Sequence, residues 1–402
     1  MRFTCFLSVA LLAACGARSS LPVADDDGGG ADGGGGADGG GGQGTGGSSP
    51  SGVEQVALGG GHTCVRTLEG EVYCWGQNGS GQLGVMTTEG FSELPVRVKL
   101  PGRADLLAAG TYHTCAVLED QRLFCWGKNT NGQIGNGTTS NALAPVEVSV
   151  GGGPSVVSLG EQHSCAVVDK TRLYCWGANG LKQAGLDASG DILSPTLVDS
   201  PAVAVATGSF HTCWVRSGGA VVCVGANTDG ECGQLGAVSQ VFPPAAPAGM
   251  EDKIATDVVS GTGRHTCARA DGAFMCWGDN STGQLGLGFV TDNEPAWVIP
   301  EPPSGTWKAI SPGTTHTCGL AGDRPYCWGD NFSGQLGVAG ASTDSAVPVG
   351  LTGVKAIDAG SVHTCGYVSP TEIWCWGTNS FGQLGNGQTS SLPNLPVQAS
   401  LP

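Results

Sequence analysis

Short apolar runs separated by turn-forming residues make up most of the chain from residue 53 onward. Runs such as 156–159 and 203–206 have the length of strands. Other runs are led by proline, as in 95–98 and 145–148, and proline suits strand starts and edges because it has no amide proton to donate. No stretch has a helical period of apolar positions. The pattern therefore predicts an all-β protein.

One motif recurs seven times across residues 53–402, at a spacing of about 50 residues. Each copy carries His-Thr-Cys or His-Ser-Cys, then Cys-Trp-Gly and Gly-x-Asn, with Cys223-Val224-Gly225 as the variant in the fourth copy. A Gly-Gln-Leu/Ile-Gly turn closes six copies, and Lys182-Gln183-Ala184-Gly185 replaces it in the third. Four short strands in each of seven repeats predict a seven-bladed β-propeller.

Gly-x-x-His-Thr-Cys, Cys-Trp-Gly-x-Asn and Gly-Gln-Leu-Gly at this spacing resemble the repeat of the regulator-of-chromosome-condensation family, which forms seven-bladed β-propellers. The resemblance covers residues 53–402. It implies closure by a strand lent between the termini, so residues 395–398 are expected to complete the blade that contains Val53–Cys74. Ultraviolet photoreceptors of the family build tryptophan clusters on Gly-Trp-Arg-His-Thr. No copy here has that tryptophan, so photoreception is not expected.

Two cysteines flank a hairpin in every repeat. They lie ten residues apart in five copies, which centres the hairpin on one residue, such as Glu69, in a three-residue loop. They lie nine apart in two copies, around the two-residue turns Asp271-Gly272 and Gly322-Asp323. Because turn and spacing shorten together, the sulfurs stay opposite each other, as a cross-strand disulfide requires. The predicted disulfides are Cys64–Cys74, Cys115–Cys125, Cys165–Cys175, Cys213–Cys223, Cys267–Cys276, Cys318–Cys327 and Cys365–Cys375.

A zinc site and reduced packing thiols are the alternatives to these disulfides. Zinc would need further ligands in each repeat, and no recurring acidic residue or second histidine supplies them. No metal or other cofactor is therefore predicted. Cys232 has no repeat partner and lies in what reads as an insertion, Asp229-Gly230-Glu231-Cys232. It is expected to be an unpaired thiol, either buried and inert, or reactive or paired between molecules.

All seven histidines of the chain belong to the repeats. A residue present in every blade cannot define one active site, so each histidine is expected to support the scaffold by hydrogen bonding a strand end. The recurring tryptophans are interpreted in the same way, as blade packing. No histidine is left for acid–base or triad chemistry, and no catalytic residue is predicted. An enzyme that uses carboxylates in the central channel is the alternative.

The first 52 residues have a different composition from the repeats. Residues 1–14 combine Arg2 with the apolar run Phe3–Leu12, which is too short to span a membrane and is typical of a secretory signal. Leu12-Ala13-Ala14-Cys15 resembles the bacterial lipobox, which implies lipidation of Cys15; an ordinary signal peptide is the alternative. Residues 15–52 are predicted to be a disordered tether, because 16–52 hold 16 Gly and five Asp. The expected location is the bacterial envelope, at the outer membrane or cell surface, which also favours disulfides.

The charge of the repeats limits the choice of partner. Residues 53–402 carry 29 acidic and 16 basic side chains without a basic cluster. Nucleic acid is therefore not expected as a partner, and neither is a small GTPase, which would be absent outside the cytoplasm.

The sequence predicts a lipid-anchored scaffold that binds a protein or glycan through loops that differ between blades. The candidate contacts are Tyr112 and Phe210 in Gly-x-x-His turns, and Phe332 and Phe381 in Asn-x-x-Gly turns; local packing is the alternative for each. An enzyme inhibitor, by analogy with relatives that inhibit β-lactamases, and a purely structural envelope protein are further function classes.

Overall fold

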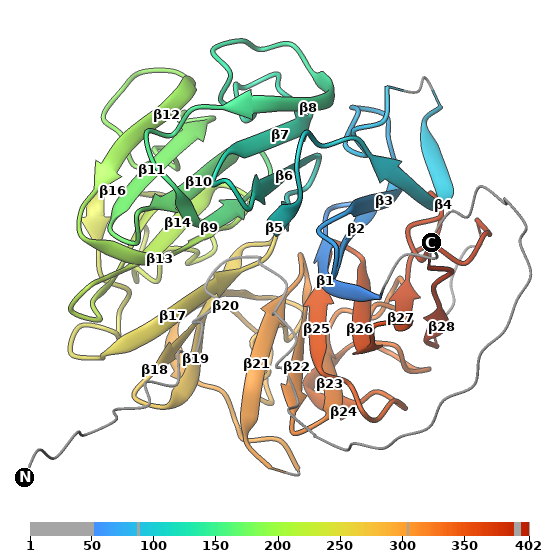
Figure 1. Cartoon of the computed structure of the whole chain (residues 1–402). Helices are drawn as coiled ribbons and strands as arrows, with labels where there is room; N and C mark the ends of the chain where they lie inside the picture. Colours follow the sequence, from blue (N-terminus) through green and yellow to red (C-terminus); the bar gives the residue numbers. More distant parts are fainter. Residues whose placement is uncertain (1–51, 87–88, 304, 390–394, 402) are drawn as a thin grey trace, which may run out of the picture.

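A ring of seven four-stranded antiparallel sheets forms the protein (Figure 1). The computed structural model describes residues 52–86, 89–303, 305–389 and 395–401. Blades 1 to 4 consist of β1(Val53–Leu58), β2(His62–Thr67), β3(Val72–Gln77), β4(Phe91–Val98); β5(Ala104–Ala109), β6(His113–Leu118), β7(Leu123–Gly127), β8(Ala142–Val148); β9(Pro154–Leu159), β10(His163–Val168), β11(Arg172–Gly177), β12(Ile192–Asp199); β13(Ala202–Thr207), β14(His211–Arg216), β15(Val221–Ala226), β16(Gln240–Ala245). Blades 5 to 7 consist of β17(Ala255–Ser260), β18(His265–Ala270), β19(Ala273–Asn280), β20(Thr291–Val298); β21(Trp307–Pro312), β22(His316–Ala321), β23(Arg324–Gly329), β24(Thr343–Pro348); β25(Ala356–Ala359), β26(His363–Ser369), β27(Glu372–Gly377), β28(Val397–Gln398).

The predicted all-β propeller is confirmed, with consecutive strands of the chain paired in each blade. Within those ranges every regular element is a strand. No helix in that part of the chain is long and apolar enough to cross a membrane. The predicted signal segment 1–14, Cys15 and the tether 15–51 lie outside the described residues.

The hairpin turns have the geometry that their sequences favour. Gly70 closes the first three-residue loop at φ 73°, a left-handed conformation that glycine adopts without steric cost. Asp271 and Gly272 have φ values of 51° and 86°, as a two-residue type I′ turn requires. The seventh hairpin differs from the predicted three-residue loop, because a bulge before Ser369 lets this residue pair with Glu372. Its loop is therefore shortened to two residues.

Tryptophan joins neighbouring blades. Trp126 of blade 2 is fully buried, and its Nε1 donates to the carbonyl of Gln82 in blade 1 at 2.9 Å. A Cβ on Gly84 would lie 2.9 Å from the Trp126 ring, so the turn after β3 needs glycine at this point of contact. The same contact recurs around the ring, except in blade 4, where Val224 replaces tryptophan. There Trp214, on the neighbouring strand, is buried instead and donates to Asp199 Oδ2 at 2.7 Å.

The proline-led runs lie inside the outer strands rather than at their starts. β4 begins at Phe91, and Pro95 lies between Ser92, which pairs with Gly76, and Val96, which pairs with Cys74. Three residues of β4, 93–95, thus lie opposite one residue of β3, Trp75, which is a bulge on an edge strand. A bulge tolerates proline because the unpaired residue needs no ladder hydrogen bond.

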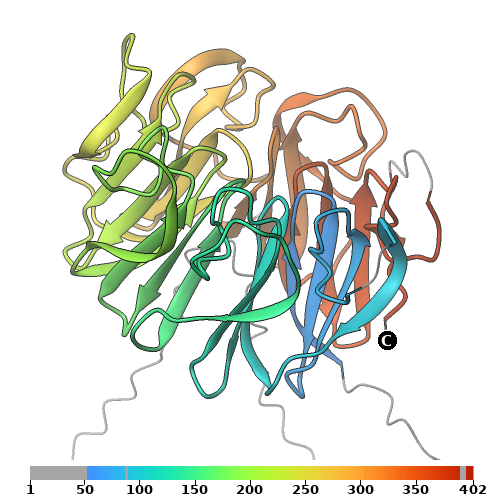
Figure 2. The same ribbon diagram turned by 90° about the horizontal axis from the view of Figure 1, so that it is seen from above.

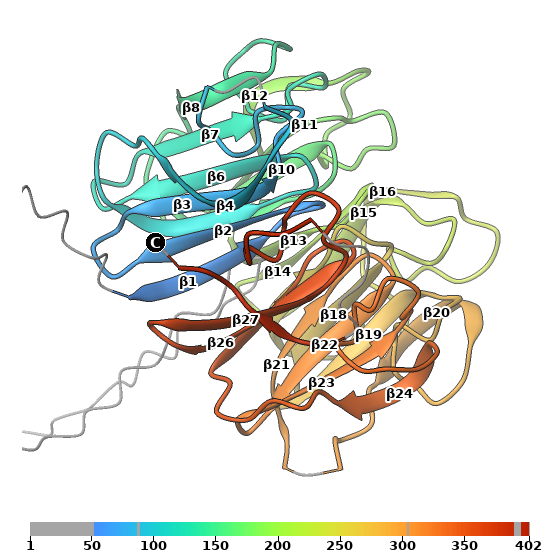
Figure 3. The same cartoon turned by 90° about the vertical axis from the view of Figure 1, so that its right-hand side faces the viewer.

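The expected exchange of a strand between the termini is wrong. β28 pairs with β27, so residues 397–398 complete the last blade, and β4 completes the first. Figure 3 shows the first and last blades meeting side by side at the seam. Side chains and turns close the ring there: Asp358 Oδ2 accepts from the amide of Leu58 at 2.9 Å, and Gly385 packs against Trp75. The chain therefore needs no lent strand to close.

The strands run between two ends of the ring (Figure 2). One end, the turn face, carries the seven turns that precede the histidine strands, beginning with 59–61. The Asn-x-x-Gly turns lie at the same end, because the strand before the first of them returns there: the Gln77 amide donates to Gly61 O at 2.8 Å. The other end, the hairpin face, carries loops such as 68–70. β1 begins at the hairpin face, where Val53 pairs with Thr67.

Candidate protein-interaction face

The seven histidines form a closed ring of contacts between blades. Each Nε2 lies 2.7–2.9 Å from the Thr or Ser hydroxyl of the next blade; the pairs are His62–Thr114, His113–Ser164, His163–Thr212, His211–Thr266, His265–Thr317, His316–Thr364 and His363–Thr63. In the first pair the Thr114 hydroxyl donates its single proton to Gln82 O at 3.0 Å, so the imidazole Nε2 must donate to Thr114. The partner of each histidine is thus a hydroxyl at the start of the second strand of the next blade, in agreement with the expected contact to a strand end.

Three of these histidines are held neutral by burial. Burial lowers the pKa of His113 to about 3, of His163 to about 4 and of His211 to about 3. A neutral imidazole inside the ring has the single Nε2 proton that the contact with the next blade uses. The histidines therefore hold neighbouring blades together through these contacts.

The fourteen repeat cysteines lie in the seven predicted pairs, with S–S distances of 2.05–2.14 Å. Paired Cα atoms are 4.0–4.1 Å apart for both sequence spacings, because Cys64 is in register with Cys74 and Cys267 with Cys276. Over the described residues, no group of His, Cys, Asp or Glu has an arrangement that could hold a metal ion.

Cys232 is not in an insertion, and this corrects the alignment of the fourth repeat. Its amide donates to Asn227 Oδ1 at 3.1 Å, just as the Leu83 amide donates to Asn78 Oδ1 in blade 1. Glu231 takes the place of the repeat glutamine, since its carbonyl accepts from Trp277 Nε1 at 3.1 Å. Gln234-Leu235 only imitates the turn motif three residues later, and Leu235 is exposed.

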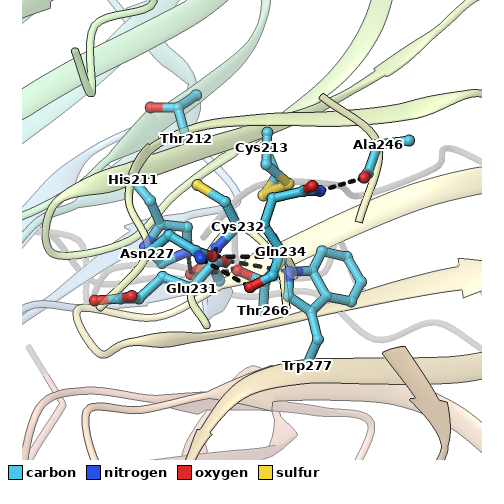
Figure 4. Close-up of a disulfide and its surroundings, with 12 residues drawn as sticks. His211, Thr212, Cys213, Asn227, Glu231, Cys232, Gln234, Ala246, Thr266 and Trp277 are labelled. Atoms are coloured by element: carbon cyan, nitrogen blue, oxygen red, sulfur yellow. Dashed lines mark hydrogen bonds between the residues drawn. A yellow bond between two sulfur atoms is a disulfide. The ribbon is translucent and has the colours of Figure 1, made fainter. Parts of the chain in front are cut away.

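Cys232 is therefore a core residue at the position of Leu83. The thiol packs in one cluster with the Cys213 disulfide and Trp277, and its Sγ lies 3.2 Å from Ala226 O (Figure 4). Burial raises its pKa well above the usual value, which suppresses the reactive thiolate. Among the described cysteines it alone is unpaired, and its surroundings favour the inert interpretation.

The turn face holds a depression of about 440 Å³ at the centre of the ring. Turns of blades 2 to 7 line it, and most of the lining residues carry hydroxyls: Thr111, Ser209, Thr262, Thr314, Thr315 and Ser361. The other lining side chains are Tyr112, Glu161, Phe210, Arg264 and Asp279. This composition is polar, with two aromatic rings and more acidic than basic groups, which suits recognition rather than storage of an apolar ligand.

The four predicted contact residues all lie on the turn face. Tyr112 and Phe210 line the central depression. Phe332 is 88% exposed on the adjoining turn of blade 6, where its amide donates to Asp330 Oδ1 at 3.0 Å. Phe381 of blade 7 crosses the seam, since a Cβ on Gly61 of blade 1 would lie 3.5 Å from its ring. The sequence supplied these aromatic residues, and the fold brings them to one face.

Thr262 is a functional candidate that the motif comparison missed. The fifth copy has three residues between Gly261 and His265, where the other copies have two, and this extra residue was the available signal. Thr262 is buried, and its Oγ1 lies 2.9 Å from Thr314 Oγ1 and 2.7 Å from Ser361 Oγ. It thereby connects blades 5, 6 and 7 across the depression and forms part of its floor.

The same turn positions the basic residue of the depression. Arg264 Nη1 donates to Asp229 Oδ2 of blade 4 at 2.5 Å, and the Asp279 amide donates to the Arg264 carbonyl at 3.0 Å. Lys128, on the adjoining turn, places its Nζ 4.9 Å from the centre of the Tyr112 ring. Both cations near the depression are thus engaged by groups of the protein itself.

The sequence profile of the Regulator of chromosome condensation (RCC1) repeat matches residues 53–82, 105–133 and 155–183, and a second profile of this repeat matches 69–117 and 120–167. These matches lie in blades 1 to 3. Residues 53–183 thus carry RCC1 repeats. Blades 4 to 7 have the same disulfide within the hairpin and the same histidine contact to the next blade. The resemblance inferred from the motifs is therefore confirmed.

Known RCC1-repeat proteins match most of the propeller. The Ultraviolet-B receptor UVR8 of Arabidopsis thaliana is 29% identical over 314 residues, which are 77% of this chain and 59% of the receptor. The probable E3 ubiquitin-protein ligase HERC6 of Homo sapiens is 30% identical over 79% of this chain and 27% of the ligase. The chain thus spans less than two thirds of these relatives, so their activities do not follow from the match.

Solved propellers share the architecture. Prp20p of Saccharomyces cerevisiae, whose crystal structure was described with its binding properties to Gsp1p and histones, superposes with a TM-score of 0.74 at 19% identity. The match covers 84% of this chain and 87% of Prp20p. At that identity the similarity establishes the fold alone, and function has to be argued from this chain's own face.

Proposed function

We propose that this RCC1-repeat propeller is a lipid-anchored, extracytoplasmic scaffold that binds a protein partner through its turn face. The observation that carries the proposal is the convergence of four aromatic residues, Tyr112, Phe210, Phe332 and Phe381, from four blades on one face. Two of them, Tyr112 and Phe210, line the depression, and aromatic residues are frequent anchors of protein interfaces. The relatives named as a receptor and a ligase are consistent with a propeller used for recognition.

The place where the tether joins the ring supports the turn face as the binding face. β1 starts at the hairpin face, so a chain anchored through Cys15 would be attached at that face and would leave the turn face accessible. A glycine-rich tether of this length has a reach of roughly 35 Å, enough to keep the ring clear of lipid headgroups. The membrane attachment itself rests on the Leu12-Ala13-Ala14-Cys15 motif.

Membrane attachment is tested with Cys15→Ser in the full chain. The unaltered protein should partition into detergent and incorporate a fatty-acid probe, and the variant should do neither. A variant that stays membrane-bound and labelled would rule out Cys15 as the anchor. Cys232→Ser is the matched control, because that thiol is buried in blade 4 and should not change attachment.

The binding face is tested by photo-crosslinking in intact cells. A benzophenone amino acid replaces Phe332 on the turn face or Leu68 on the hairpin face, which are 88% and 49% exposed. Defined adducts from position 332 and none from position 68 would support the proposal. Equal adducts from both positions, or adducts from position 68 alone, would reject the turn face as the binding face.

A further inference from the structure

We infer that the central depression of the turn face binds a lysine or arginine side chain of the protein partner. The inference rests on the proposed function and specifies the chemistry of that partner. It follows from which hydrogen-bonding groups of the depression are still available, and from the charge of the chain around them.

The single basic residue that lines the depression is already neutralised. Arg264 Nη1 lies 2.5 Å from Asp229 Oδ2, and this ion pair reduces the attraction of Arg264 for an anionic ligand. The two acidic residues that line it keep acceptor capacity. Glu161 Oε1 accepts from Gln162 Nε2 at 3.3 Å, and Asp279 Oδ1 accepts from the Ser281 amide at 2.8 Å. Since a carboxylate has about four acceptor sites, both can accept further hydrogen bonds.

A buried hydroxyl in the wall gives an independent indication of a ligand. Thr111 lines the depression and is 8% exposed, and its Oγ1 has no hydrogen-bond partner in the protein. A buried polar atom without a partner is unfavourable, so its presence in a cavity wall favours a site that a polar ligand completes. A hydroxyl oxygen and two carboxylates together favour a ligand that brings donors, as an ammonium or guanidinium group does.

The aromatic rings of the depression and the negative charge of the chain also favour a cationic ligand. Tyr112 already attracts one cation, since Lys128 Nζ lies 4.9 Å from its ring centre, and Phe210 adds a second ring to the wall. The chain has a net charge of −16, which attracts basic partners over long range and repels acidic ones. A depression of about 440 Å³ is large enough for one long side chain with its hydration water.

The test uses the mature full-length protein and four pentapeptides that carry arginine, lysine, glutamine or glutamate between glycines, with binding followed by NMR titration. Arginine and lysine peptides should bind, glutamate peptides should not, and affinity should fall as NaCl is raised from 50 to 500 mM. The double variant Glu161→Gln, Asp279→Asn should weaken binding at least tenfold. Glu69→Gln, an exposed acidic residue on the hairpin face, is the matched control and should have no effect.

Three results would overturn the inference: equal binding of all peptides, unchanged binding in the double variant, or binding of a disaccharide panel in place of the peptides. Circular dichroism of the double variant shows whether the fold is retained, which both isosteric changes at partly exposed positions should allow. If selective photo-crosslinks from position 332 persist while the cationic peptides fail, the proposed binding face stands and only the cation site is rejected.

Discussion

His363 Nε2 lies 2.9 Å from Thr63 Oγ1, and this hydrogen bond joins the last blade to the first. The Thr63 hydroxyl in turn donates to Gln383 O at 2.8 Å, the same carbonyl that accepts from Trp75 Nε1 at 3.0 Å. The seam is therefore built from the same four groups (imidazole, hydroxyl, glutamine carbonyl and indole) as the junctions of blades 1 and 2, 2 and 3, 5 and 6, and 6 and 7. The ring is therefore closed by hydrogen bonds between residues of the repeat motif.

Removing this hydroxyl should open the seam. Thr63→Val keeps the shape of the side chain but leaves the His363 donor and the Gln383 carbonyl with one partner fewer. We expect the free energy of unfolding to fall by about 1–3 kcal/mol, measured by guanidinium denaturation. Thr130→Val, at an exposed turn, is the control and should change it by less than about 0.5 kcal/mol. Equal effects of the two changes would show that the Thr63 hydroxyl does not stabilise the seam.

Acid should destabilise the ring. The three histidines with pKa values of about 3 to 4 stay neutral in the folded protein, whereas in the unfolded chain they titrate near 6.5. As pH falls below 6.5 the unfolded chain takes up protons that the folded protein does not, so stability is lost down to about pH 4. Asp257 opposes this, because burial raises its pKa to about 7 and the folded state takes up its proton first.

The net difference of two protons predicts a loss of roughly 3 kcal/mol per pH unit inside this window. Guanidinium midpoints measured between pH 8 and pH 4 check it, and a midpoint that does not move between pH 6.5 and pH 4.5 would refute it. Asp257→Asn should steepen the decline, since it removes a group that opposes it; Glu231, whose pKa is also raised by burial, acts in the same direction as Asp257.

The thiol of Cys232 should not react with thiol reagents until the protein unfolds. It is fully buried and its pKa is raised by burial, so iodoacetamide should not label the native mature protein at neutral pH. In denaturant without reductant, about one cysteine per chain should be labelled, at Cys232. Peptide mapping of the same sample should find the seven pairs within hairpins. Labelling of the native protein, or links between blades, would be incompatible with the structure.

Truncation of the C-terminus should loosen one blade. β28 pairs only with β27, and the Ala399 amide donates to Ile373 O at 2.9 Å. Deletion of 395–402 should therefore speed amide hydrogen exchange around Ile373, while Val56 in β1 keeps its protection because its partner strand β2 is intact. Faster exchange at both positions would show that the terminal strand also supports the first blade.

The repeat determined most of the fold from sequence alone. Seven copies of one motif fixed the number of blades, and the coupled change of turn length and cysteine spacing fixed the pairing, because both depend on contacts within one hairpin. The number of histidines alone indicated a scaffold role, and each of them makes the same contact between blades. Local information also misled once: Gly233-Gln234-Leu235-Gly236 matched the turn motif, but Glu231-Cys232 makes the contacts.

Only the tertiary structure decided the contacts between repeats. The partner of His363 is 300 residues away, and no local pattern shows that Thr63 receives it. The bonds of Thr262 to Thr314 and Ser361, and the gathering of Tyr112 and Phe210 around one depression, likewise depend on how the blades are placed around the axis. Hairpin geometry follows from neighbouring residues, whereas the position of one blade relative to another depends on packing of the whole closed ring.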